Sequence, residues 1–306
     1  YPGGCEIGAR PIDLHLSAFK KLGINVEEKG GFIHCTCDKI KATEIDLDFP
    51  SEGATENIIL ATVLAEGVTT IINAAMEPEI EDLAKFLNKM GAKIVGAGTN
   101  IIKITGVKAL KDVSYKVMPD RIEAGTFLAM VAATGGKAKL LNANSEHITP
   151  IIHKLEECGC NIEIIDKEIN IESPKKLKAA NIKTLPYPGF PTDMQSIFAS
   201  MLVISKGTSV VVENIFENRF KYMTQLQKMG AKSQIEGNTL IIKGVRHLNG
   251  ANVEATDLRG GAALILAGLI AKGKTRVSNI QFIQRGYEDL ESKLQNLGAK
   301  IKIENT

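Results

Sequence analysis

The sequence has no marked excess of charge of either sign, and this absence excludes several classes of protein. Its 306 residues include 37 Lys and Arg against 35 Asp and Glu, which leaves a net charge of +2 at pH 7. Proteins that bind nucleic acids or anionic membranes through their overall charge are far more basic than this. We therefore expect neither a nucleic acid nor a membrane as a partner.

Long apolar runs and metal-ligand patterns are absent as well. The longest apolar run, residues 262–271, is too short to span a bilayer. Only five cysteines occur, which is typical of a reducing compartment, so we expect a cytoplasmic protein. Cys35 and Cys37, like Cys158 and Cys160, are two residues apart, a spacing that metal sites do not favour. The five histidines form no ligand pattern either. We expect the four cysteines of these two sequence pairs to pack in the core.

A repeat is the most informative feature that is present. Helical segments that end in Gly-Ala-Lys or a close variant recur at intervals of 68 to 71 residues, with their glycines at Gly23, Gly91, Gly159, Gly230 and Gly298. Each glycine fits the left-handed position that closes a helix, and an alternating, strand-like segment follows it. The sequence therefore predicts an array of similar units.

One unit can be outlined between residues 43 and 107. The expected order is strand, helix, strand, helix, strand and strand, at residues 43–49, 51–66, 69–74, 78–90, 92–95 and 100–105. Such a βαβαββ unit mixes parallel and antiparallel pairing. We therefore predict an α/β architecture of packed repeats.

The first sixteen residues form a glycine-rich loop that carries one thiol. Three glycines surround Cys5, and a loop of this composition can lie close to a ligand. Arg10 precedes a predicted helix over residues 12–22, and the positive field there favours the thiolate. Cys5 is therefore either a reactive cysteine or a buried structural one.

Corresponding positions open the first helix of each complete unit, at Ser51, Asp120, Asp193 and Asp257. Ser and Asp are the expected helix N-caps. Helix N-termini gathered around an axis would also form an anion site. We single out Asp193, for which a cap and a group that orients or deprotonates a hydroxyl remain alternatives.

Several motifs resemble, in order and along the whole chain, those of the enolpyruvyl transferases that act on UDP-N-acetylglucosamine. The loop motif is Pro-Gly-Gly-Cys at residues 2–5, with Ile-Gly-Ala-Arg-Pro at 7–11 and Asp-Leu-His at 13–15. The other motifs lie at residues 119–123, 190–195, 216–220, 255–259 and 285–288.

The resemblance implies an inside-out α/β barrel, with helices inside and sheets outside, in two domains of βαβαββ units. Residues 1–118 would form a partial catalytic-loop domain with about one and a half repeats, and residues 119–306 a second domain of three repeats. We accordingly expect that an N-terminal segment of the same protein is missing and would act as a partner of this chain.

The resemblance also implies a reaction. The enolpyruvyl group of phosphoenolpyruvate would pass to the 3′-hydroxyl of UDP-N-acetylglucosamine with release of phosphate, the first committed step of peptidoglycan synthesis. Cys5 would protonate the methylene carbon, Asp193 would position or deprotonate the hydroxyl, and Arg285 would neutralise charge on the phosphate. No metal and no organic cofactor is expected.

Substrate-binding residues are carried over from the same resemblance. They are Arg10, Pro11, Ile12, Asp13, Leu14, Phe49, Pro50, Ser51, Glu52, Asp193, Ile215 and Arg259. Glu52 departs from the pattern of the family, because a small apolar residue is common there and a carboxylate would repel a diphosphate.

Three other functions remain open. A transferase that acts on shikimate 3-phosphate shares the fold but lacks the cysteine loop. A ring that clamps nucleic acid would need a basic inner helix face, whereas acidic residues crowd the helix start at 77–82. An inactive paralogue would bind the sugar nucleotide without releasing phosphate.

Overall fold

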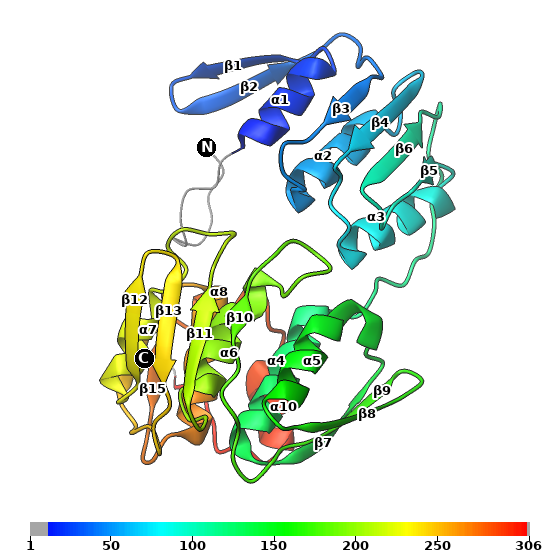
Figure 1. Ribbon diagram of the computed structural model, residues 1–306. Coiled ribbons are helices and arrows are strands. Elements are labelled where there is room, and N and C mark those ends of the chain that lie inside the picture. Colours follow the sequence, from blue (N-terminus) through cyan, green and yellow to red (C-terminus); the bar gives the residue numbers. More distant parts are fainter. Residues whose placement is uncertain (1–11, 305–306) are drawn as a thin grey trace. The chain divides into compact units, whose positions relative to one another are not determined.

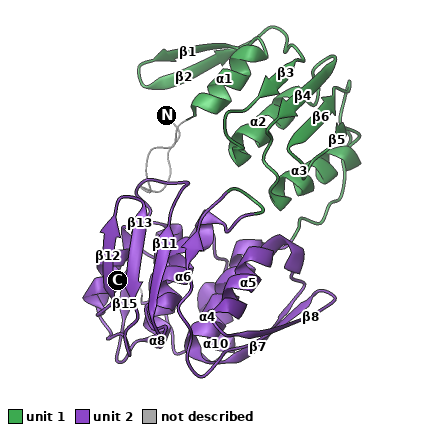
Figure 2. Ribbon diagram, in the orientation of Figure 1, with its two compact units in different colours: residues 1–3, 10–118, 186–188 green, residues 4–9, 119–185, 189–306 purple. Residues whose placement is uncertain are grey.

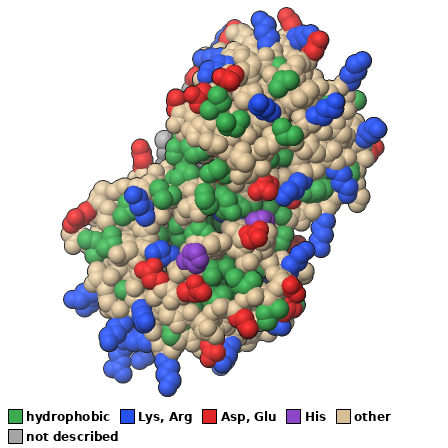
Figure 3. Space-filling view, turned by 45° about the vertical axis from the view of Figure 1, so that its right-hand side comes forward, with side chains coloured by type: hydrophobic (Ala, Val, Ile, Leu, Met, Phe, Trp, Pro, Cys, Tyr) green, Lys and Arg blue, Asp and Glu red, His purple; other side chains and the backbone are tan. Residues whose placement is uncertain are grey.

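The computed structural model describes residues 12–304, so Cys5, Arg10 and Pro11 lie outside it. The described chain divides into two compact units (Figure 2). Unit 1 comprises residues 12–118 and 186–188, and unit 2 comprises 119–185 and 189–304. Acidic and basic side chains occur over both units on the face that Figure 3 shows, in keeping with the small net charge.

Unit 1 contains one complete βαβαββ repeat, as the sequence predicts, preceded by a helix and a hairpin (Figure 1). Its elements are α1 (Asp13–Lys21), β1 (Asn25–Lys29), β2 (Phe32–Thr36), β3 (Glu44–Asp46), α2 (Glu52–Thr62), β4 (Val68–Ile72), α3 (Pro78–Lys89), β5 (Lys93–Val95) and β6 (Ile101–Thr105). The four strands of the repeat are ordered β3-β4-β6-β5. β3 runs parallel to β4, and the other two pairs are antiparallel.

The core of unit 1 lies between this sheet and helices α2 and α3. Strand residues alternate between buried and exposed, as a sheet covered on one face requires. Ile71 and Ile102 from the sheet, with Ile58 from α2 and Ile80 from α3, are fully buried. α2 begins where Ser51 Oγ accepts a hydrogen bond from Ala54 N at 3.3 Å, so this residue is the predicted N-cap.

Unit 2 follows the order of the repeat three times, but only the middle copy, residues 182–243, shows all six elements. Among the described residues, the first copy lacks its opening strand and the last lacks its closing strands, so the strand-like segment predicted after Gly298 forms no strand. The elements of unit 2 are α4 (Arg121–Thr134), β7 (Lys137–Leu141), η1 (Ser145–Ile148), α5 (Thr149–Glu157), β8 (Asn161–Ile165), β9 (Glu168–Glu172), β10 (Ile182–Lys183), η2 (Thr192–Met194), α6 (Gln195–Leu202), β11 (Thr208–Val212), α7 (Tyr222–Lys228), β12 (Lys232–Glu236), β13 (Thr239–Lys243), β14 (Asn252–Glu254), α8 (Leu258–Ile270), β15 (Arg276–Ser278), α9 (Gln281–Gln284) and α10 (Leu290–Asn296). Its sheets are β7-β9-β8, β10-β11-β13-β12 and β14-β15.

Helices α4, α6 and α8 form the centre of unit 2, and the sheets lie around them (Figure 1). Leu128, Phe198 and Leu264, one from each helix, are fully buried. A helix that is apolar on all sides needs such a central place, and the apolar run 262–271 lies mostly in α8. The predicted arrangement of helices inside and sheets outside is confirmed within this unit. No helix of residues 12–304 is long and apolar enough to cross a membrane.

The five glycines of the repeat all have left-handed φ angles, from 82° at Gly23 to 105° at Gly91. The predicted helix ends are therefore confirmed, because a residue with a Cβ adopts this conformation only at a cost.

The prediction for the cysteines is half wrong. Cys158 and Cys160 are buried, and burial raises the pKa of Cys158 to about 12 and that of Cys160 to about 11. Cys35 and Cys37 are exposed. Cys35 lies on the hairpin β1-β2, which forms a sheet of its own. Nearly all residues of this hairpin are solvent-exposed. The alternation of this segment therefore indicates a strand but no core.

Gly244 provides a test of the packing in unit 2. A Cβ on Gly244 would overlap the carbonyl oxygen of Ser205, and neither backbone can shift freely because Gly244 N donates to Gly207 O at 2.9 Å. We predict that Gly244→Ala lowers the free energy of unfolding by ~3 kcal/mol. Thermal unfolding measures the change. Gly136→Ala is the matched control, since nothing lies within 3.9 Å of the new methyl, and equal melting temperatures for the two variants would contradict the prediction.

Candidate active site

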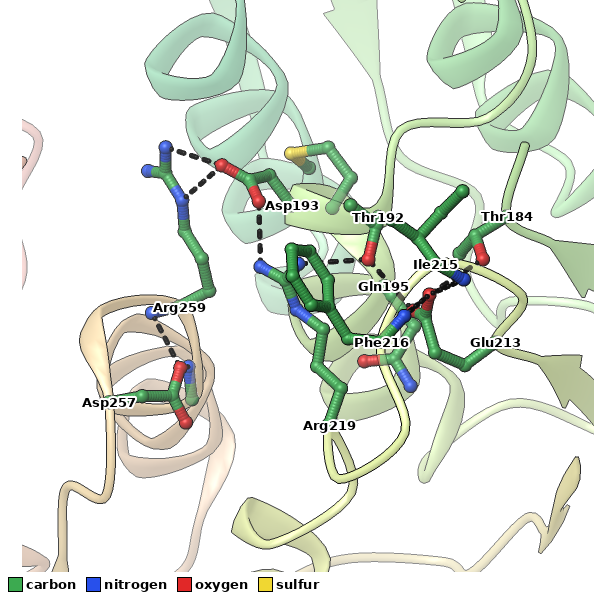
Figure 4. Close-up of polar contacts among 12 residues, drawn as sticks. Thr184, Thr192, Asp193, Gln195, Glu213, Ile215, Phe216, Arg219, Asp257 and Arg259 are labelled. Carbon is green, nitrogen blue, oxygen red and sulfur yellow. Dashed lines mark hydrogen bonds and ion pairs between the residues drawn. The ribbon is translucent and has the colours of Figure 1, made fainter. Parts of the chain in front are cut away.

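Asp193 lies in the short helix η2, directly before α6, and it does not cap a helix. Pro191 is the N-cap residue of η2. The prediction of a cap is confirmed for Asp120 and Asp257, whose carboxylates accept backbone hydrogen bonds in the first turns of α4 and α8. For Asp193 the cap hypothesis is wrong, because its carboxylate binds two arginines (Figure 4).

The two arginines reach Asp193 from different elements. Arg219 Nη2 donates to Asp193 Oδ1 at 2.6 Å, from the turn that follows β11. Arg259 donates to Oδ2 through Nε at 3.0 Å and through Nη2 at 2.9 Å, from the first turn of α8. We call these three residues the Asp193 cluster. The arginine side chains are only 3% and 13% exposed, whereas that of Asp193 is 38% exposed and can be reached from solvent.

The arginines control the charge of Asp193. Burial alone would raise its pKa, but Arg219 and Arg259 outweigh burial and lower the pKa to about 2. Asp193 is therefore ionised at neutral pH. A carboxylate with so low a pKa is a weak proton acceptor, so in this state it is suited to orienting a hydroxyl rather than to deprotonating it.

Besides Asp193, two residues hold Arg259 in place, namely Asp257 and Tyr287. Asp257 Oδ1 accepts from the Arg259 backbone N–H at 3.0 Å, and the guanidinium lies over the ring of Tyr287, 5.4 Å from its centroid. Tyr287 is almost completely buried, and its hydroxyl lies 2.9 Å from Thr126 Oγ1 on α4. Burial tends to lower the pKa of Arg259, but the neighbouring Asp193 and Tyr287 raise it overall, so Arg259 stays charged.

Each arginine of the cluster retains one unused donor. Among the described residues, Arg219 Nε and Arg259 Nη1 are buried and make no hydrogen bond. An unmatched buried donor is unfavourable. Two such donors beside an accessible carboxylate therefore indicate a place where an anion or a polar ligand can bind.

Arg219 was not among the residues predicted for the site. The motif at residues 216–220 contains it, but the sequence offers no local sign that this arginine is buried. The structure also places Ile215, predicted to bind substrate, in the same turn, where its N–H donates to Glu213 Oε1 at 2.8 Å.

Arg285, which the resemblance assigns to the phosphate, lies at the end of a helix. It is the C-cap residue of α9, and α10 begins only at Leu290. Asp289, the residue before α10, has a left-handed φ of 47°, so the chain turns between the two helices. Arg285 is exposed and lies two residues before the buried Tyr287.

The predicted nucleotide-binding residues of unit 1 lie at the starts of α1 and α2. Ile12 is the N-cap residue of α1, and Asp13 and Leu14 lie in its first turn. Phe49 and Pro50 lead into Ser51 and Glu52, where α2 begins. The two helices contact each other.

A polar contact also joins the first turn of α1 to the second turn of α2. His15 Nδ1 lies 2.6 Å from Asn57 Nδ2, and burial lowers the pKa of His15. Unit 1 therefore brings its own group of predicted residues together, just as unit 2 brings together Asp193, Ile215 and Arg259. In the part of the chain that the structure describes, no group of three His, Cys, Asp or Glu side chains could hold a metal ion.

Known proteins resemble this chain over almost its whole length. A relative from Carboxydothermus hydrogenoformans, named UDP-N-acetylglucosamine 1-carboxyvinyltransferase 2, is 57% identical over 304 residues, which are 98% of this chain and 72% of the relative. UDP-N-acetylglucosamine 1-carboxyvinyltransferase 1 from Caldanaerobacter subterraneus is 54% identical over 300 residues, with the same coverage.

Solved structures share the fold. The enolpyruvyl transferase NikO from Streptomyces tendae superimposes with a TM-score of 0.86 at 23% identity, over 96% of this chain and 73% of that one. An EPSP synthase from Acinetobacter baumannii gives a TM-score of 0.75 at 20% identity, over 99% of this chain and 74% of that one. The family model described as EPSP synthase (3-phosphoshikimate 1-carboxyvinyltransferase) matches residues 1–294. With this match and relatives more than half identical, the chain belongs to the EPSP synthase family of carboxyvinyl transferases.

Proposed function

We propose that this chain transfers the enolpyruvyl group of phosphoenolpyruvate to the 3′-hydroxyl of UDP-N-acetylglucosamine and releases inorganic phosphate, as the names of its relatives suggest. The reaction is the first committed step of peptidoglycan synthesis, and we infer a cytoplasmic location for it. The observation that carries the proposal is the Asp193 cluster: an accessible carboxylate between two charged arginines, each with an unused donor.

The reaction proceeds by addition and elimination. Cys5 donates a proton to the methylene carbon of phosphoenolpyruvate while the sugar oxygen bonds to the adjacent carbon. The resulting tetrahedral phospho-ketal then loses phosphate from the central carbon and a proton from the methyl group, and the carbon–carbon double bond of the enol ether forms again. The methyl proton returns to the thiolate that Cys5 became when it gave up its own proton. Arg259 and Arg285 stabilise the charge of the phosphate and carboxylate groups, for which the guanidinium fork is well suited.

The state of Asp193 changes when the anionic substrate binds. Phosphate and carboxylate groups compete with Asp193 for the guanidinium groups of Arg219 and Arg259, which are now bound to it. Each bond lost to the substrate, and each negative charge added nearby, raises the pKa of Asp193 from its value of about 2. Substrate binding therefore converts a carboxylate that only orients the hydroxyl into one that can also take its proton.

The sugar nucleotide is assigned to two groups of residues. Arg10, Pro11, Ile12, Asp13, Leu14, Phe49, Pro50, Ser51 and Glu52 form one group, and Ile215 with Asp193 forms the other. Support for the first group comes from α2, an 11-residue helix whose N-terminal N–H groups favour a diphosphate. Glu52 opposes this attraction unless its carboxylate points away from the phosphates.

Two alternatives are separated by the choice of acceptor. The loop with Cys5 and residues 10–13 favours the amino sugar over shikimate 3-phosphate. If phosphoenolpyruvate releases phosphate only when shikimate 3-phosphate is the acceptor, the chain is the shikimate 3-phosphate transferase. If the sugar nucleotide binds but no phosphate is released, the chain is an inactive paralogue. All these assays use the natural protein that carries these 306 residues.

Asp193→Asn is expected to impair both turnover and stability. Asn cannot accept the hydroxyl proton, so kcat for phosphate release should fall by ~10²-fold or more. Asn also leaves Arg219 and Arg259 without a countercharge. We expect the free energy of unfolding to fall by roughly 1–3 kcal/mol, less than for a fully buried pair because Asp193 is partly exposed.

Asp120→Asn is the matched control for this change. Asp120 opens α4 and caps it through hydrogen bonds to Ile122 N and Glu123 N at 2.7 and 2.9 Å. Asn caps a helix about as well as Asp, so both kcat and the melting temperature should stay near those of the wild type. Near-normal kcat in Asp193→Asn would exclude Asp193 from the chemistry.

Cys5 is expected to be the most reactive thiol. The epoxide fosfomycin, a phosphate mimic, should alkylate Cys5, and phosphoenolpyruvate should protect it. Peptide mass spectrometry distinguishes this thiol from the exposed Cys35 and Cys37 and the buried Cys158 and Cys160. Cys5→Asp should retain turnover and resist the reagent, because a carboxylic acid can also donate a proton. Labelling at any other cysteine in preference to Cys5 would contradict the assignment.

A further inference from the structure

Glu213 is a carboxylate buried behind the Asp193 cluster that the reaction described above does not use. It follows β11 and is only 2% exposed. Its Oε1 accepts from Thr184 Oγ1 at 2.9 Å, from Ile215 N at 2.8 Å and from Phe216 N at 3.2 Å. Its Oε2 accepts from Thr192 Oγ1 at 2.9 Å. Four donors therefore converge on a group that is costly to bury unless it is fully bonded.

The bond to Thr192 determines how Arg219 is held. A hydroxyl has one proton to donate, and Thr192 gives it to Glu213. Thr192 Oγ1 thereby presents a lone pair to Arg219 Nη1, which donates to it at 2.8 Å. Because the guanidinium is planar, this bond fixes the direction of Nη2, the atom that binds Asp193 Oδ1 (Figure 4).

The bonds to Ile215 and Phe216 fix the turn that carries Arg219. The Phe216 ring lies 5.1 Å from the centre of the Arg219 guanidinium. Glu213 therefore acts on Arg219 by two routes, through Thr192 and through Phe216, and it also sets the position of Ile215.

Comparison with the other repeats indicates that the fold does not require a carboxylate here. The residue after the corresponding strand is Asn73 after β4, Asn142 after β7 and Asn279 after β15, each with a left-handed φ of 56° to 58°. Glu213 replaces this asparagine only in the copy that contains Asp193, and its φ is not left-handed.

The side-chain hydrogen bond that this asparagine makes is also present in the copy with Glu213, where Asn214 makes it and Glu213 takes no part. Asn73 Nδ2 donates to Leu47 O at 2.7 Å, and here Asn214 Nδ2 donates to Thr184 O at 3.0 Å. The residue whose carbonyl oxygen accepts this bond is the apolar Leu47 in unit 1 but Thr184 in this copy. The hydroxyl of Thr184 donates to Glu213. A polar pair has therefore been added to the one repeat that carries the catalytic carboxylate.

We propose that Glu213 is a positioning residue of the transferase. It orients Thr192, which sets the plane of Arg219 against Asp193, and it holds the turn at Ile215 where the sugar nucleotide binds. This inference rests on the proposed function, and it adds a residue that does not touch the substrates.

The test is a double-mutant cycle of Glu213→Gln and Thr192→Val, with kcat and KM measured by phosphate release. Both single variants should lower kcat by roughly 10-fold, as loss of a supporting hydrogen bond to a catalytic group typically does. The double variant should be no slower than the slower single variant, because both changes break one chain of contacts. KM for UDP-N-acetylglucosamine should rise in Glu213→Gln but not in Thr192→Val, since only Glu213 holds the turn at Ile215.

Several outcomes would overturn the proposal. A residue that merely supports the fold would give independent losses, so a kcat in the double variant equal to the product of the two single losses would exclude a positioning role. If Glu213→Gln does not fold, Thr192→Val decides alone, and unchanged kcat in that variant sinks the proposal. Glu168→Gln removes a partly exposed carboxylate that pairs with Lys139 within the sheet β7-β9-β8, and it should leave kcat unchanged.

The wild-type protein separates this proposal from the proposed function. Turnover by the wild type together with normal kinetics of Glu213→Gln and Thr192→Val would remove only the role of Glu213. Absence of phosphate release by the wild type with both substrates would remove the proposed function, and the role of Glu213 with it.

Discussion

The structure around the candidate site depends on the neutralisation of two buried arginines. Arg219 and Arg259 are almost completely removed from solvent, and an unpaired buried charge costs several kcal/mol. Asp193 compensates both, and Glu213 reaches Arg219 through Thr192. The four residues come from η2, the turn after β11 and the start of α8. The packing of α6 against α8 in the core of unit 2 is therefore also what brings these charges together.

Much of the fold could be predicted because its signals are local. A glycine that closes a helix, an alternating strand and an apolar helix each show in a few neighbouring residues, and the repeat made each signal visible several times. The βαβαββ order and the left-handed glycines are confirmed for that reason. The exposure of Cys35 could not be predicted, because alternation indicates a strand but not whether a second layer covers it.

The residues of the candidate site could be predicted only where they belong to a recognisable sequence motif. Asp193 was found through its motif and its place in the repeat, but the sequence could not exclude a helix cap because the partners of its carboxylate are distant in sequence. Arg219 lies 26 residues away and Arg259 lies 66 residues away, and no local pattern reports such pairing. Glu213 shows the same limit: its sequence position identifies a strand end, and only the fold reveals four donors around its carboxylate.

The charge balance of the cluster has a consequence for binding and turnover. The two arginines share the carboxylate of Asp193, while Asp257 lies at the backbone of Arg259 and Glu213 lies behind Thr192, so carboxylates already offset the guanidinium charges in the resting site. In the proposed function, an incoming anion competes with Asp193 for the arginines, and this competition reduces the affinity that two free arginines would provide. In the proposed reaction, the same competition would raise the proton affinity of Asp193 when the hydroxyl proton is taken. In that proposal, stability in the resting state and activity in the bound state use alternative pairings of the same charges, in which the unused donor atoms of both arginines can take part.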